Sequence, residues 1–189
     1  SEPDHVFDLY GKDARDPGTY AANCLLARRL LERGVRCVQL YHQGWDQHGG
    51  LPKQLRAQCR DTDQPSAALI KDLKQRGLLD STIVHWGGEI GRLPVTENNG
   101  KEDNFGRDHN GQGFSAWFAG GGFKAGITYG ETDEVGHRAV VNKVTPNHIQ
   151  ATILKLFGID YRNLHYLHNG QARSLTDGRD CRVVEEILV

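Results

Sequence analysis

The segment Val35-Arg-Cys-Val-Gln-Leu-Tyr41 decides the fold that the sequence predicts. Its apolar residues lie on both faces of an extended chain, which is typical of a strand buried inside a parallel sheet. A helix is predicted before this strand, from the Asp16-Pro17 start signal to Gly34, a residue suited to a left-handed helix end. The strand is therefore expected to follow a helix across a short turn.

The same alternation continues along the chain. A second helix is predicted from Asp63 to Gly77, and residues 81–86 form the next predicted strand. A strand, a helix and a strand with short links predict a right-handed crossover between parallel strands. A third strand is predicted over 114–119 and a last helix over 146–157. We therefore predict an α/β fold with a mostly parallel sheet flanked by helices, with residues 1–15 as a polar arm and 16–189 as the domain.

Composition excludes some classes of function. The chain has 189 residues, of which 25% are charged, and its net charge is −1 with no run of lysine or arginine. This argues against nucleic acid as a partner, because binding to phosphates needs a concentrated basic face. Its apolar stretches fall short of the ~20 residues of a membrane span. No signal peptide pattern is seen.

Carboxylates and histidines gather at the predicted strand ends. Asp46 and His48 follow the first strand, Glu89 follows the second, and Asp108-His109 lies on the loop that enters the third. Ligands of open α/β sheets bind beyond the carboxyl ends of strands. These five residues predict a divalent metal site for zinc, manganese, calcium or magnesium. The alternative is a set of turn carboxylates and surface histidines.

Two arginines flank these carboxylates. Arg92 follows Glu89 closely, and Arg107 precedes Asp108. Guanidinium groups bind phosphate, sulfate or carboxylate through bidentate hydrogen bonds, so either arginine is a candidate catalytic residue that binds an anionic group. Structural ion pairs are the alternative.

Several motifs together resemble one family. They are Gly44-Trp-Asp-Gln-His-Gly49, Gly87-Gly-Glu-Ile-Gly-Arg92, Gly106-Arg-Asp-His-Asn110 and Ala119-Gly-Gly-Gly122. The chain from about residue 8 onward is similar to a large bacterial family catalogued as domain of unknown function fifteen-zero-one. That family is sulfatase-like and belongs to the alkaline phosphatase superfamily, so the resemblance implies that fold and a metal-dependent hydrolase of sulfate or phosphate esters.

The resemblance also implies roles for particular residues. Asp46 and His48 match ligands of one metal, with His109 as its late histidine and Asp108 beside it. Glu89 matches the carboxylate of the other metal site, although the superfamily usually has Asp-His where this chain has Glu89-Ile90. Family members are roughly twice as long, and their N-terminal half carries the nucleophile and a further metal ligand.

The resemblance therefore implies that this chain is the C-terminal half of an exported or periplasmic parent protein, with an incomplete fold and site. Its expected partners are a small anionic ester or a sulfated glycan, the missing N-terminal half, and a second copy of the chain. We expect the isolated chain to be inactive. The alternative function is a non-catalytic sulfatase-like module that binds an anion, a glycan or a protein.

Overall fold

The computed structural model describes residues 2–98 and 104–189. The chain divides into two compact units. The first consists of residues up to Asp80 together with Arg92–Asn110, and the second consists of Ser81–Gly91 and Gly111–Val189. Within the described residues, no helix is both long enough and apolar enough to cross a membrane.

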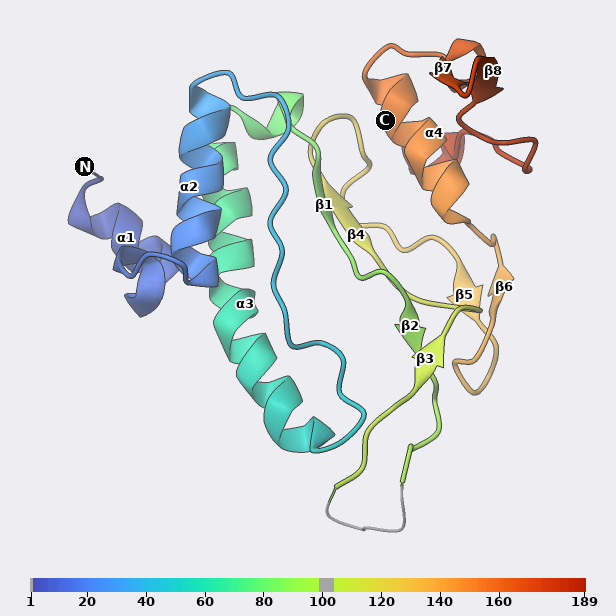
Figure 1. The fold of residues 1–189 in the computed structure, drawn as a ribbon. Coiled ribbons are helices and arrows are strands. Elements are labelled where there is room, and N and C mark those ends of the chain that lie inside the picture. The colour runs from blue at the N-terminus through green and yellow to red at the C-terminus, as the bar shows by residue number, and fades with distance from the viewer. Residues whose placement is uncertain (1, 99–103) are drawn as a thin grey trace. The chain divides into compact units, whose positions relative to one another are not determined.

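The first unit is built from three α-helices, α1 (Asp4–Tyr10), α2 (Tyr20–Glu32) and α3 (Leu51–Gln75), with a short 3-10 helix at Lys12–Arg15. Figure 1 shows α2 running beside α3, and these two helices form the main contact of the unit. The Thr19 hydroxyl accepts the Ala22 N–H at 3.1 Å, which fixes the start of α2. The core includes Val6, Tyr10 and Cys24.

A buried polar cluster crosses this helical core. Asp72 on α3 accepts hydrogen bonds from the Tyr10 hydroxyl at 3.0 Å, from Arg28 Nε at 2.8 Å and from Arg76 Nε at 2.6 Å. Arg28 is 1% exposed and Asp72 is 3% exposed. A buried charge needs such partners, because an unpaired one costs several kilocalories per mole. The cluster therefore joins all three helices.

The second unit consists of short hairpins and one helix. β1 (Val84–Trp86) pairs with β4 (Trp117–Ala119), β5 (Glu131–Thr132) with β6 (Ala139–Val141), and β7 (His165–His168) with β8 (Gln171–Ser174), each antiparallel. Helix α4 (Pro146–Leu156) starts at a Thr145 capping box. Further 3-10 helices span Leu79–Ser81, Tyr161–Asn163 and Glu185–Ile187. The core is formed by Phe123, Val184, Ile187 and Leu188.

The predicted parallel sheet is wrong. Among the described residues, the sheets are two-stranded pairs; β1 pairs antiparallel with β4, and the parallel crossover expected between residues 35–41 and 81–86 is not seen. In this antiparallel register His85 stacks on Phe118, with ring centroids 4.4 Å apart, and Trp86 stacks on Trp117. The part of the chain that the structure describes therefore does not form the mostly parallel α/β sheet that the resemblance implied.

Residues 35–41, the predicted first strand, form an extended segment without a strand partner among the described residues. Val38 and Leu40 are half-buried, and Leu40 packs on the helical core, while Val35, Cys37 and Tyr41 are exposed. The segment thus buries one side only. An apolar run indicates burial but does not specify a hydrogen-bonded neighbour.

The helices match the prediction better than the strands do. Helix α4 lies where it was predicted. Helix α2 begins at Tyr20 because Thr19, three residues after Asp16, provides the cap. Helix α3 begins twelve residues before Asp63, so Pro65 lies inside it. Residues 1–15 were expected to be a polar arm, and the structure places α1 there with Val6 and Tyr10 buried.

Candidate metal centre

Two segments of the first unit meet at the candidate site. One is the loop between α2 and α3 that carries Asp46 and His48, and the other includes β3 (His109–Asn110), which pairs with β2 (Gly91–Arg92). Backbone hydrogen bonds join them: Arg107 N–H donates to Gln47 O at 3.0 Å, and Leu51 N–H donates to Phe105 O at 3.0 Å. The Gln47 side chain is buried and donates to Gly44 O, which closes the loop.

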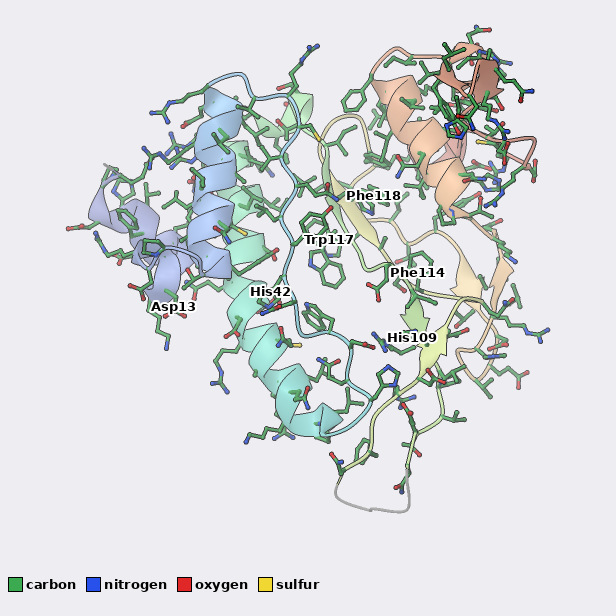
Figure 2. The ribbon with its side chains drawn as sticks, in the orientation of Figure 1. Asp13, His42, His109, Phe114, Trp117 and Phe118 are labelled. Carbon is green, nitrogen blue, oxygen red and sulfur yellow. The ribbon has the colours of Figure 1, made fainter. Side chains whose placement is uncertain are left out.

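Asp46, His48 and His109 converge at one point. Asp46 Oδ1 lies 2.9 Å from His48 Nε2 and 2.9 Å from His109 Nε2. The two Nε2 atoms lie 3.3 Å apart. Figure 2 labels His109 at β3. All three side chains are exposed to solvent, so an ion can reach them.

These distances fit a metal ion. Ligand atoms about 2.0–2.1 Å from zinc and separated by the tetrahedral angle lie roughly 3.3 Å from one another. The three separations of 2.9, 2.9 and 3.3 Å are close to that spacing. Two imidazoles and a carboxylate are also a ligand set that zinc and manganese accept, whereas calcium and magnesium prefer oxygen alone. The trio therefore offers one face of a coordination tetrahedron.

Two further carboxylates surround the trio. Glu97 Oε2 lies 2.6 Å from His48 Nδ1, and Asp108 Oδ1 accepts the His109 backbone N–H at 2.7 Å. Glu97, Asp108 and His48 also place ligand atoms within 4.8 Å of one another. The neighbourhood therefore contains three carboxylates, of which Asp46 is paired with Arg92.

The charges at the site shift two pKa values. Hydrogen bonds from His109 and Arg92 lower the pKa of Asp46 to about 2. The hydrogen bond to Glu97 raises the pKa of His48 above its ordinary value. Asp46 is therefore ionised at neutral pH, and proton binding at His48 competes with metal binding over a wider pH range than at an ordinary histidine.

Residues 1–188 match the family described as protein of unknown function (DUF1501). The chain belongs to this family. No curated protein and no solved structure matches the chain. The family expected from the motifs is thus confirmed, whereas membership in the alkaline phosphatase superfamily and the position in a C-terminal half stay predictions.

The DUF1501 motifs supply most of the cluster. Of the five predicted metal ligands, the structure brings Asp46, His48 and His109 together and places Asp108 beside them. Glu89 is exposed and belongs to the second unit, so it is not among the residues that the first unit assembles.

The two predicted anion-binding arginines are engaged within the protein. Arg92 Nη1 donates to Asp46 Oδ1 at 2.6 Å, and Arg107 Nη1 donates to Leu93 O at 2.8 Å. Arg92 is thus part of the cluster, while Arg107 holds the loop.

Sequence reasoning missed Glu97. It lies between the predicted strands over 81–86 and 114–119, outside every motif. An antiparallel bridge between Glu97 and Gly106 brings it to His48. The only usable signal was a carboxylate nine residues before Gly106, and that spacing does not by itself indicate pairing between the two residues.

Proposed function

We propose that this chain provides the metal-binding part of a metal-dependent hydrolase of sulfate or phosphate esters. The observation that carries the proposal is the convergence of Asp46 Oδ1 with the Nε2 atoms of His48 and His109, at separations of 2.9 to 3.3 Å. The ligand set favours zinc or manganese among divalent metals.

The residues of the site have distinct tasks in this proposal. Asp46, His48 and His109 hold the ion. A metal held there would polarise the ester oxygens and lower the pKa of the attacking hydroxyl or water. Arg92, which contacts Asp46 at 2.6 Å, is placed to hold the anionic sulfate or phosphate group beside the ion.

The remaining parts of the proposal rest on the family resemblance. The nucleophile and the second metal site would come from an N-terminal half of the parent protein, which would be exported. The substrate would be a small anionic ester or a sulfated glycan. The isolated chain is therefore expected to bind a metal without robust turnover.

Equilibrium dialysis followed by elemental analysis tests the proposal. The 189-residue chain is dialysed against zinc and, separately, manganese, beside Asp46→Asn and the exposed control Asp61→Asn. We expect about one bound ion in the chain and in Asp61→Asn, and loss of binding in Asp46→Asn. Equal, weak uptake by all three proteins would refute the metal site. Robust hydrolysis of aryl sulfates or phosphates by the chain alone, lost in Asp46→Asn, would refute the assignment of the nucleophile to another segment.

A non-catalytic anion-binding module is the second candidate. It is favoured by the Arg92–Asp46 contact, because this cation already neutralises the carboxylate that a metal would need. In that case sulfate or phosphate should bind in the presence of a chelator, and Arg92→Gln should abolish that binding. Binding of the anion only when zinc or manganese is present would argue for the hydrolase site.

A further inference from the structure

We infer that Glu97 is the positioning residue for His48. Its carboxylate accepts a hydrogen bond from Nδ1–H of the ring and so leaves the Nε2 lone pair free for an ion that Asp46 and His109 would also bind. The inference rests on the proposed metal site and assigns a role to a residue outside the three ligands.

The geometry of Glu97 supports this role. Its Oε2 atom lies 2.6 Å from His48 Nδ1, on the opposite side of the ring from Nε2. Its backbone is held by two hydrogen bonds with Gly106, each of 2.9 Å. Gly106 in turn lies directly against the backbone of residues 47–49. The carboxylate is therefore fixed relative to the loop that carries His48.

The Glu97 contact affects which nitrogen of the His48 ring carries the proton. A neutral ring carries one N–H, and an ionised carboxylate can only accept a hydrogen bond. Asp46 Oδ1 competes for a proton on Nε2 at 2.9 Å, but the Glu97 contact is shorter, at 2.6 Å, and therefore favours the tautomer with the proton on Nδ1, which leaves Nε2 able to bind a metal. Without that contact the ring can place its N–H at Nε2, where the proton would face the ion. Carboxylates that hold the second nitrogen of a ligand histidine typically strengthen metal binding 10- to 100-fold.

A competing role for Glu97 is direct metal ligation, because its carboxylate also lies within 4.8 Å of ligand atoms of His48 and Asp108. The two roles predict different effects of a glutamine at position 97. A glutamine Oε1 atom still accepts the Nδ1–H hydrogen bond, but it is a poor substitute for a carboxylate ligand. Glu97→Gln should therefore preserve positioning and impair ligation, whereas Glu97→Leu removes both.

Two measurements on the full chain test the inference. The first is the ¹⁵N spectrum of the His48 ring in metal-free protein, at a pH well above the pKa of the ring. The second is the dissociation constant for zinc. Both are made for the wild-type chain, Glu97→Gln, Glu97→Leu and the control Glu134→Leu, which alters an exposed glutamate of the second unit. Because the pairing of Glu97 with Gly106 uses only backbone atoms, Glu97→Leu should still fold.

We expect an Nδ1–H tautomer in the wild type, in Glu97→Gln and in the control, and a mixed population in Glu97→Leu. Zinc affinity should fall 10- to 100-fold in Glu97→Leu and only a few-fold in Glu97→Gln. An unchanged tautomer in Glu97→Leu, or equal losses of affinity in both variants, would overturn the positioning role. If none of the four proteins binds zinc but the tautomer of His48 still depends on Glu97, the proposed function is wrong. The hydrogen bond between Glu97 and His48 would in that case still be supported.

Discussion

Gly106 lies directly against the backbone of His48. A Cβ atom at position 106 would overlap the His48 carbonyl carbon and would stand 2.5 Å from both the Gln47 carbonyl oxygen and the Gly49 amide nitrogen. No side chain can occupy that space, since the neighbouring atoms are backbone. The glycine therefore permits the close approach of the two segments that carry the candidate metal ligands.

Gly106→Ala should separate these two segments. We expect a loss of about 1–3 kcal/mol in the free energy of unfolding, because the backbone must move to accept the methyl group. Zinc affinity should fall as well, since Asp46 and His109 lie on opposite sides of the contact. Denaturant unfolding and zinc titration measure the two effects. Gly111→Ala is the matched control, because nothing lies within 4 Å of its Cβ position. If Gly106→Ala and Gly111→Ala had the same free energy of unfolding and the same zinc affinity, the close approach at Gly106 would not matter for the site.

Asp46 should titrate far below an ordinary aspartate in metal-free protein. Hydrogen bonds from His109 and Arg92 lower its pKa from 3.8 to about 2. Because the folded-state pKa is the lower one, the carboxylate favours the folded state above about pH 3.8, and this contribution is lost as the pH falls toward about 2. An NMR titration of the carboxyl carbon measures the shift. His109→Ala should raise the pKa of Asp46, and an unchanged value would show that the two side chains do not meet in solution.

The buried cluster at Asp72 should control the stability of the helical unit. Asp72→Asn removes the charge that faces Arg28, whose side chain is 1% exposed. Arg28 keeps contacts with Glu2 and Glu32, so we expect a loss near the lower end of the range for a broken buried pair, about 3 kcal/mol. Thermal unfolding measures it, with the exposed Asp61→Asn as control. If Asp72→Asn lowered the free energy of unfolding no more than Asp61→Asn does, Asp72 would not be required for the stability of the helical unit.

Thr152 should be needed to join α4 to the C-terminal segment. Its buried hydroxyl donates to His148 O at 2.7 Å and accepts the Val184 N–H at 2.9 Å. Thr152→Val keeps the shape of the side chain but leaves that N–H unsatisfied, which costs about 1–3 kcal/mol. Thr132→Val on an exposed strand should change stability little. Increased hydrogen exchange at the Val184 amide in Thr152→Val would support the assignment, and unaltered protection would contradict it.

The sequence predicted helices better than it predicted strands. Helix α4 was predicted well because Thr145-Pro146 and Gly158 mark its ends locally. The parallel sheet was wrong because strand pairing depends on distant segments. The pattern of Val35–Tyr41 predicted burial on both faces, yet the segment buries only Val38 and Leu40, and only partly. Periodicity alone cannot distinguish a sheet strand from an extended segment that packs on helices.

Several residues of the candidate site were predicted, but their arrangement was not. The motifs predicted Asp46, His48 and His109, and the structure brings their ligand atoms together. The predicted cause, parallel strand ends at one edge of a sheet, was wrong. Backbone contacts of Gly106 and an antiparallel bridge between Glu97 and Gly106 assemble the site instead. Glu97 could not be predicted because this pairing of loop residues leaves no periodic signal.

The coordination of bound zinc, measured by X-ray absorption spectroscopy on the zinc-loaded chain, tests the central claim most directly. The account predicts two imidazole nitrogens and at least one carboxylate oxygen around each ion. It also predicts the loss of one imidazole in His48→Ala and in His109→Ala, and no change in a control such as His165→Ala, which alters an exposed histidine of β7. A zinc environment without imidazole, or one that neither His48→Ala nor His109→Ala alters, would contradict the account.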